Sequence, residues 1–406
     1  MQTKEKTVTA ASGAKAKKVA ILFSLAEKGE RSTFLGILDY MQRHEPWFCL
    51  FDECWSGERM ADFPMTGVDG VIVSYTAEKD ARDIAALHVP VVFIEPWPEM
   101  LEPEYPLQGV PYVRRDSRAI GAEAARYYLS RGYRSFAYVG EPRGQVWSAE
   151  RRRGFEETLA EAGFGCAVYE AAFTQGPGHD WPGERKSLVR FLQGLPRATA
   201  VFAPMDRRAR LVLEACLYAD LSVPDEIAVL GVDDDRMICD STAPTLSSIH
   251  TGGFRRGRIA AEMLDALMNG REPPVRAVSQ PPIGVVTRGS TGYGAMNDPA
   301  ISKAISFIRR RAKHGNVDVA AVVRASGCSR RNLEQRFRSR LGFSIHDEII
   351  HERIDYVKSL LAADDLSIGE ITERADFSRE SNLAKTFKKE TGRTMTEWRR
   401  ENRDSR

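Results

Sequence analysis

The sequence predicts an α/β protein with parallel sheets over residues 18–290, followed by an all-α domain over residues 299–406. In the first part, short apolar runs alternate with amphipathic helical patterns, which is typical of parallel sheets covered by helices. In the last part, a Ser followed by Leu and Phe four positions apart occurs twice, as Ser329–Phe337 and Ser378–Phe387. The 406 residues also exceed one ordinary core, so two or three domains are expected.

Six runs in the first part are short, apolar and rich in β-branched residues, which favours buried strands. The predicted strands are Val19–Phe23, Gly70–Ser74, Val91–Ile94, Phe136–Gly140, Ala200–Ala203 and Ala228–Val232. The predicted helices between them are Ser32–Arg43, Ile120–Arg131, Arg151–Ala162, Arg207–Ala219 and Phe254–Met268. Ligands of such sheets bind at the carboxyl ends of the strands. Since the sequence contains neither a GxGxxG after a predicted strand nor a GxxxxGK[ST] motif, a nucleotide-phosphate site is not expected.

Charge is distributed unevenly along the chain. From Asn297 to the end there are 23 Lys and Arg against 17 Asp and Glu, a charge of +6, which leaves −4 for the preceding residues out of the total of +2. A basic end on a mildly acidic body fits a nucleic-acid-binding module on a larger protein, although ordinary scatter also gives an excess of this size.

Cysteine spacing and hydropathy exclude other classes of protein. The six cysteines show no CxxC or Cys/His spacing, so reduced thiols are expected rather than disulfides or a zinc site. Residues 1–17 lack a long apolar core and a cleavage site, which predicts a disordered tail rather than a signal peptide. The apolar run Val19–Phe23 is too short to span a membrane. We therefore expect a cytoplasmic protein with no membrane partner, metal or cofactor.

The repeated pattern predicts two helix-turn-helix motifs. Ser329 and Ser378 occupy expected helix N-cap positions, and each copy follows a short amphipathic helix and a tight turn. Helical spacing directs Leu333, Phe337 and Leu341 inward, which leaves polar side chains on the opposite face. The side chains expected to contact DNA are Arg330, Arg331, Glu334, Gln335 and Arg338 in the first copy, and Glu380, Ser381, Lys385, Lys388 and Lys389 in the second.

These outward side chains differ in the contacts that they can make. Arg, Gln and Glu near a helix start can read base edges in the major groove, whereas Lys388 and Lys389 are better placed for phosphates. The alternative is a solvated helix face. The first copy is the more basic, so it is expected to carry more of the base readout; its arginines are Arg330, Arg331, Arg336, Arg338 and Arg340.

Three motifs of the first part resemble the sensor domains of LacI-type regulators. Ser148–Phe155 matches S-x-x-R-x-x-G-F, and Val223–Asp234 matches V-P-x-D-[IV]-x-V-x-G-x-D-D with Glu226 in place of the first Asp. Pro244–Ile249 is similar to the crossover P-x-L-T-[ST]-[IV]. The resemblance implies a periplasmic-binding-protein-like sensor with two Rossmann-like lobes that close on a small ligand. The implied bounds are 18–115 and 250–270 for lobe one, 118–243 and 276–288 for lobe two, and 291–298 for a linker.

The same resemblance implies a set of ligand contacts. They are Asp116, Arg151, Asp206 and Asp233; Trp147, four residues before Arg151, is expected to supply a stacking face. Charged donors and acceptors can replace the water around a polyhydroxy ligand, and an aromatic ring can face its C–H surface. Alternatively, the aspartates are helix N-caps or salt-bridge partners. Met205 stands where the family places a neutral hydrogen-bonding residue, and a thioether is a poor acceptor. The ligand then lacks a hydroxyl at that point or differs from the familiar sugars.

The last part resembles the DNA-binding domain of the AraC/XylS family. The matching residues include Arg353 on a linker helix, Ser367–Ile371 at the start of the second motif, and Trp398 near the end. Asp376 stands where the family has Gly and Met395 where it has Pro. Because Asp tolerates left-handed backbone, the turn is still expected to form.

A LacI-type sensor joined to an AraC-type domain resembles the xylose-operon regulators of bacteria. The resemblance implies a homodimeric, ligand-responsive activator of genes for the use of a xylose-like pentose or related sugar. Its expected partners are double-stranded operator DNA with repeated half-sites, the sugar effector and RNA polymerase. The alternatives are a regulator that senses a deoxysugar or non-sugar metabolite, a binding protein for uptake, and an enzyme with a DNA-binding domain. Since we find no set of nucleophile, base and orienting group, no catalytic residue is expected.

Overall fold

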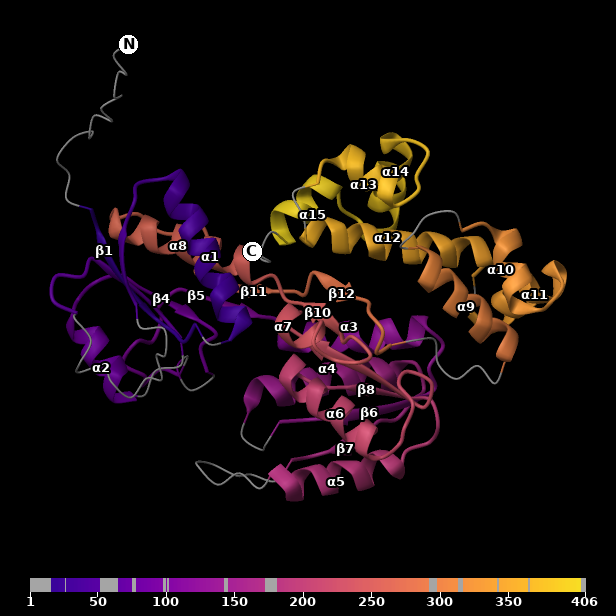
Figure 1. Ribbon diagram of the computed structural model, residues 1–406. Coiled ribbons are helices and arrows are strands. Elements are labelled where there is room, and N and C mark those ends of the chain that lie inside the picture. The colour runs from indigo at the N-terminus through magenta and orange to yellow at the C-terminus, as the bar shows by residue number, and fades with distance from the viewer. Residues whose placement is uncertain are drawn as a thin grey trace, which may run out of the picture. The chain divides into compact units, whose positions relative to one another are not determined.

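The computed structural model describes residues 16–402 except 26, 52–64, 75–77, 98–99, 101, 142–144, 172–180, 292–297, 313–316, 342 and 364–365. Most of the predicted tail and linker lies outside these described residues. The chain divides into two compact units. Unit 1 comprises Met1–Glu30, Phe34–Val113 and Gly257–Val278, and unit 2 comprises Arg31–Thr33, Arg114–Arg256 and Ser279–Arg406. Figure 1 labels the elements of both units along the chain.

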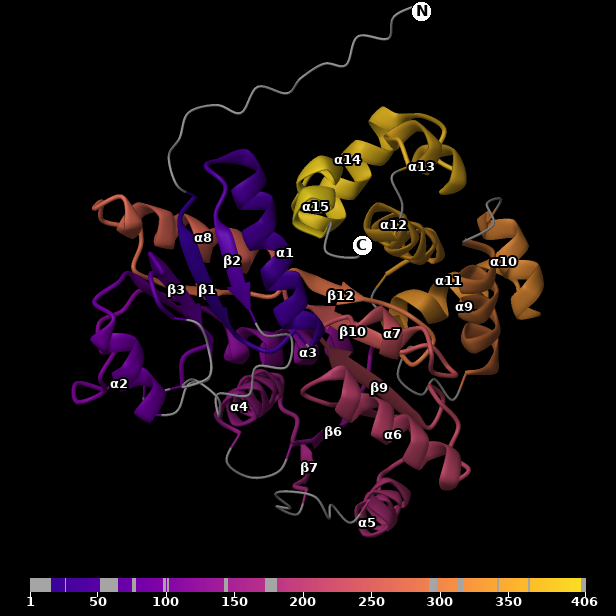
Figure 2. The same cartoon turned by 60° about the vertical axis from the view of Figure 1, so that its left-hand side comes forward.

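Unit 1 is built on a six-stranded sheet with the order β11-β5-β4-β3-β1-β2. Its strands are β1 (Lys18–Leu22), β2 (Phe48–Phe51), β3 (Gly70–Val73), β4 (Val91–Ile94), β5 (Tyr112–Arg115) and β11 (Ala277–Gln280). The pairs from β2 to β5 are parallel. One face packs on α1 (Lys28–Arg43) and α8 (Gly253–Met268), and the other on α2 (Glu78–Ala86), an arrangement visible in Figure 2.

Unit 2 contains a second six-stranded sheet with the order β12-β10-β9-β8-β6-β7. Its strands are β6 (Ser135–Val139), β7 (Ala167–Tyr169), β8 (Thr199–Phe202), β9 (Ile227–Val232), β10 (Ser247–His250) and β12 (Gly284–Val286). All pairs are parallel except β10 with β12. Helices α3 (Ser117–Ser130) and α4 (Val146–Glu161) cover one face, and α5 (Trp181–Gln193) and α6 (Asp206–Tyr218) the other. We call this sheet, its helices and the short α7 (Arg236–Cys239) the second lobe.

The two parallel α/β lobes predicted from the sequence are confirmed, and all six predicted strands and five predicted helices are present. One boundary differs. Strand β11 joins the sheet of unit 1 beside β5, whereas β12 joins the second lobe. The segment 276–288, assigned as a whole to lobe two from the sequence, therefore contributes to both sheets.

Helices α3 and α4 approach each other closely through two glycines. A Cβ on Gly121 would overlap the backbone carbonyl of Arg151, and one on Gly154 would overlap that of Arg118. Only glycine permits such an approach of two backbones. The glycine of the S-x-x-R-x-x-G-F motif thus fixes the helix that carries Arg151 against the helix that begins beside Asp116.

The C-terminal part of unit 2 is all-α, with two hydrophobic cores. Its helices are α9 (Pro299–Ala312), α10 (Val319–Ser326), α11 (Arg330–Leu341), α12 (Ile345–Ala363), α13 (Ile368–Arg374), α14 (Glu380–Thr391) and α15 (Met395–Asn402). The first core joins α9, α10 and α11 to the start of α12, and the second joins α13, α14 and α15 to its remainder. We call these the first and second subdomains. Leu333, Phe337, Leu383 and Phe387 are fully buried in them, as predicted.

Each helix-turn-helix turn contains a left-handed residue. Gly327 has φ 72° and Asp376 has φ 58°, so the turn expected at Asp376 forms. The Asp376 carboxylate accepts a hydrogen bond from Arg353 Nη2 at 2.7 Å, and the same nitrogen donates to the carbonyl of Val317 at 3.2 Å. Arg353 lies on α12 and thereby ties the two subdomains together.

The helix starts agree only in part with the sequence pattern. The hydroxyl of Ser329 accepts from the N–H of Asn332 at 3.4 Å, and Ser367 forms a capping box at the start of α13. At α14, however, the N-cap is Arg379, without a side-chain cap. Ser378, predicted as the cap, lies one residue earlier and accepts from the side-chain amide of Asn382 at 2.9 Å.

Candidate functional site

The predicted ligand residues of unit 2 gather at the carboxyl edge of the second-lobe sheet. Arg151 follows β6 on α4, Asp206 begins α6 after the three residues that follow β8, and Asp233 directly follows β9. Parallel neighbouring strands end at the same edge, which brings residues far apart in the chain together.

Arg151 is buried, with 2% of the residue exposed. Its Nη1 donates to the carbonyl of Pro204, and its guanidinium lies 4.9 Å from the ring centroid of Trp147. The hydroxyl of Tyr138 donates to the carbonyl of Ser148 at 2.7 Å and so holds the start of α4 to β6. The guanidinium covers one face of the Trp147 ring, so a sugar ring can stack only on the opposite face.

Asp233 occupies strained backbone at the end of β9. Its φ is 100°, in the region that favours glycine, and the next residue, Asp234, has φ 54°. The Asp233 carboxylate accepts from the hydroxyl of Thr251 at 3.3 Å and lies 3.9 Å from Arg115 Nε. Since Arg115 directly precedes Asp116, the ion pair also links Asp233 to the start of α3.

Asp206 is buried, with 2% of the residue exposed. Its Oδ1 accepts from the hydroxyl of Ser248 at 2.5 Å and its Oδ2 from the N–H of Asp235 at 2.7 Å. Burial raises the pKa of Asp206 well above its ordinary value, and the nearby charge of Asp233 raises it further. These contacts tie α6 to β10 and to the loop after β9, so Asp206 stabilises the packing of this edge. Ligand contact by Asp206 stays a prediction.

Asp116 is the N-cap of α3, where its Oδ1 accepts from the N–H of Ala119 at 2.8 Å. Its own N–H donates to the carbonyl of Gln280 at 2.8 Å. The sequence left helix capping as the alternative role of Asp116, and the structure shows this role. Ligand contact by Asp116, through its second carboxylate oxygen, stays a prediction.

Three arginines near this edge, of which Arg208 is buried and Arg115 and Arg288 are half-buried, were not predicted as site residues. Arg115 pairs with Asp233, Arg208 donates to the carbonyl of Gly140 at 2.8 Å, and Arg288 pairs with Asp234 at 2.7 Å. The partners of Arg208 and Arg288 lie 68 and 54 residues away in the chain. No local pattern could have indicated them.

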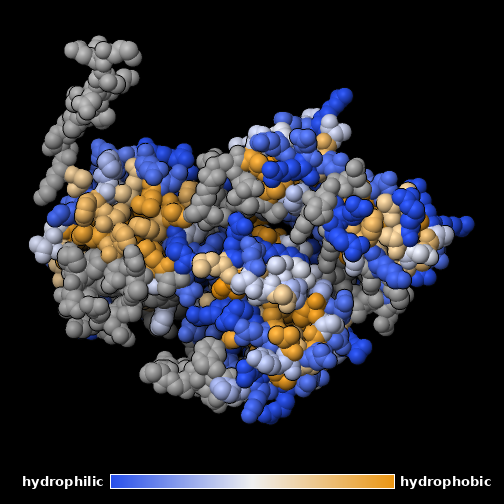
Figure 3. Space-filling view, in the orientation of Figure 1, coloured by the Kyte–Doolittle hydropathy of each residue, from blue (hydrophilic) through white to orange (hydrophobic). Residues whose placement is uncertain are grey.

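The predicted DNA-contacting side chains lie outward on α11 and α14. All of them are exposed except Glu334, which is half-buried. In Figure 3 the part of unit 2 that carries α10 and α11 shows an apolar patch bordered by hydrophilic residues. Arg336, counted among the basic residues of the first copy, instead pairs with buried Asp298 at 2.8 Å. Burial opposes the ionisation of Asp298, but Arg336 holds its pKa below the ordinary value.

The comparisons with known proteins agree with this geometry. Residues 125–291 match a periplasmic binding protein-like domain and residues 322–401 a helix-turn-helix domain. The chain is 31% identical to the xylose operon regulatory protein of Haemophilus influenzae over 384 residues, which cover 94% of this chain and 98% of that protein. This chain belongs to the xylose operon regulatory protein family. The corresponding Escherichia coli K12 protein is 30% identical over 94% of this chain and 96% of its own length.

A solved structure of this family, described as that of the xylose-binding transcription activator xylR, covers 96% of this chain and 99% of its own, with a TM-score of 0.61 and 29% identity. The resemblances inferred from the motifs are thus confirmed, and the chain is a DNA-binding transcription regulator. Among the described residues, no helix is long and apolar enough to cross a membrane, and no group of His, Cys, Asp and Glu could hold a metal ion.

Proposed function

We propose that this regulator responds to a pentose of the xylose type, bound at the carboxyl edge of the second-lobe sheet. The observation that carries the proposal is the buried Arg151 guanidinium held over Trp147. The names of the relatives, which are xylose operon regulators, support the class of ligand.

A thermal-shift screen of D-xylose, other pentoses, hexoses, uronic acids and deoxysugars tests this proposal. We expect D-xylose to raise Tm in the wild type, and Trp147→Leu and Arg151→Lys to reduce the shift. Arg153→Ala is the matched control, because Arg153 lies on the same helix with 70% of its side chain exposed. A full shift in both site variants would place the ligand elsewhere.

Met205 supports one alternative effector. Its sulfur lies 3.7 Å from Arg207 Nη2, and the residue is the N-cap of α6 without a side-chain cap. A soft, apolar thioether, which is a poor acceptor, suits a deoxysugar or non-sugar metabolite at this position better than a fully hydroxylated sugar. A larger Tm shift with a deoxypentose than with D-xylose would favour this alternative, and Met205→Asn should then reverse the order.

For DNA recognition, we propose that α11 reads bases and that α14 contributes fewer base contacts. The exposed Arg331 on α11 and Lys385 on α14 allow a direct comparison. Selection of binding sites from random DNA should show relaxed base preference for Arg331→Ala and a nearly unchanged preference for Lys385→Ala. The opposite order would make α14 the main reader.

We further propose that the protein acts in the cytoplasm as a homodimeric activator that recruits RNA polymerase and has no enzymatic turnover. The repeated half-site architecture expected for its operator fits a two-fold symmetric protein. Sedimentation of the full chain and transcription in a purified system test the dimer and the activation. Ligand-dependent turnover of any sugar in the screen would contradict the regulator-only view.

A further inference from the structure

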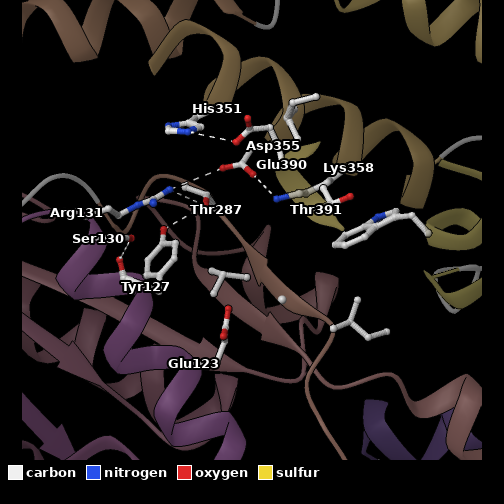
Figure 4. Close-up of a pocket in the computed structure, with 15 residues that line it drawn as sticks. Glu123, Tyr127, Ser130, Arg131, Thr287, His351, Asp355, Lys358, Glu390 and Thr391 are labelled. Atoms are coloured by element: carbon white, nitrogen blue, oxygen red, sulfur yellow. Dashed lines mark hydrogen bonds and ion pairs between the residues drawn. The ribbon is translucent and has the colours of Figure 1, made fainter. Parts of the chain in front are cut away.

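Within unit 2, a cavity of about 400 Å³ lies where the second lobe meets the second subdomain. Figure 4 shows that its walls come from α3 and the β12 region on one side and from α12, α14 and α15 on the other. Its lining includes Tyr127, Arg131, Ile283, Gly284, Asp355 and Trp398.

A polar contact joins the two sides of this cavity. Arg131, the C-cap of α3, has its Nη2 3.8 Å from Asp355 Oδ2, and the two side chains are 13% and 17% exposed. The same nitrogen donates to the hydroxyl of Thr287 at 3.1 Å, and the guanidinium lies 4.0 Å from the ring centroid of Tyr127. Lys358 contacts Asp355 at 2.8 Å. Burial opposes ionisation of Asp355, yet Lys358 and Arg131 lower its pKa.

An apolar contact lies beside the ion pair. Ile283 packs against the core of the second subdomain, although it precedes β12 of the second lobe. A Cβ on Gly284 would lie 3.8 Å from the Trp398 ring, so the β12 backbone runs directly beside α15. Side chains of the sensor and the DNA-binding domain thus share one core.

Two elements lead from this contact to the predicted ligand residues. Helix α3 begins at its cap Asp116 and ends at Arg131; its 14 residues span about 21 Å. Strand β12 pairs with β10, whose Ser248 donates to Asp206. Both routes are continuous hydrogen-bonded structure, which is the kind of connection that can carry coupling between sites.

We propose that α3 and β12 dock the second helix-turn-helix subdomain onto the second lobe through Arg131, Asp355 and Trp398, and that this contact makes the placement of that subdomain depend on the effector. The proposal of effector dependence rests on the proposed function, whereas the docking contact does not. The outward residues Lys385, Lys388 and Lys389 of α14 are exposed in the docked arrangement. Docking therefore leaves the DNA-facing side of the subdomain open.

Hydrogen–deuterium exchange of the full chain tests the docking contact. In Arg131→Glu, amides of residues 283–287 and 351–358 should exchange roughly five- to tenfold faster, as expected for loss of a coupled ion pair. Asp355→Asn changes the other side of the contact and should accelerate amide exchange in the same two segments. The double variant should exchange little faster than either single variant. Arg126→Glu is the control, because it introduces the same change of charge on α3. The Arg126 side chain is 57% exposed and pairs with Glu123 of the same helix. Unchanged exchange in both contact variants would overturn the docking.

The effector dependence is tested with D-xylose as the probe. If D-xylose raises Tm of the wild type, it should also change exchange at residues 351–358, and Arg131→Glu should abolish that change while keeping the Tm shift. A Tm shift without any change at residues 351–358 would overturn the relay. If D-xylose produces no Tm shift, the proposed function fails instead, and the variants still decide the docking contact.

Discussion

Replacement of Gly154 by Ala tests the close approach of α3 and α4. A Cβ at this position meets the backbone carbonyl of Arg118, and a helix backbone cannot give way as a flexible side chain does. Overpacking costs up to roughly 3 kcal/mol, while Ala in place of Gly within a helix gains about 1 kcal/mol. We therefore expect the free energy of unfolding to fall by about 2 kcal/mol.

Urea denaturation of the full chain, followed by tryptophan fluorescence, measures this loss. Gly165→Ala is the matched control, because a Cβ there meets nothing within 4 Å. If Gly154→Ala were as stable as that control, the helices could separate at no cost and our account of the motif glycine would be wrong. The variant should also weaken any Tm shift with D-xylose, since α4 carries Arg151.

Three further variants test other contacts. Arg353→Met removes the hydrogen bonds that join the two subdomains and should lower the free energy of unfolding by about 1–3 kcal/mol. Arg324→Met, at an exposed position, is the control; equal Tm values for these two variants would refute the link. A hydrogen bond with Glu348 raises the pKa of His351. The contribution of this contact to folding stability is therefore complete below pH 6.5 and is lost as pH rises through the raised pKa. The Tm difference between wild type and His351→Gln should shrink over that range, and a constant difference would argue against an ionised contact. Asp206→Ala leaves the buried Ser248 hydroxyl and the half-buried Asp235 N–H without their acceptor and should cost about 2–4 kcal/mol in chemical denaturation; a neutral effect would show that these two donors find other acceptors.

Much of the fold follows from local pattern. Runs such as Ala228–Val232 are apolar on both faces because helices cover both sides of a parallel sheet, and they could be located from the sequence. Strand β11 was assigned to the wrong lobe because its pairing is decided by β5 and not by its own residues; the Tyr112 N–H donates to the carbonyl of Arg276, 164 residues further along the chain. The inward direction of the Leu and Phe side chains on α11 and α14 was predicted correctly because helical spacing fixes it.

The candidate site was less accessible to sequence reasoning. Motif positions indicated Arg151 and Asp233, but the pairing of Arg115 with Asp233 and of Arg336 with Asp298 depends on tertiary packing. A charged residue in a motif looks the same whether it faces solvent, DNA or a buried carboxylate. Only the structure separates Arg336, which is held by Asp298, from its exposed neighbour Arg338.

Helix α12 also sets a geometric limit on the DNA sites that one chain can bind. Its 19 residues span about 28 Å, a little less than the ~34 Å of one turn of DNA, and Arg353 bonds to both subdomains. Insertion of one residue into α12 rotates one reading helix relative to the other by about 100°, whereas added base pairs rotate half of the site by about 36° each. The spacing of bases within each half-site is therefore fixed by the length of a single helix, so natural sites should tolerate sequence changes far better than insertions.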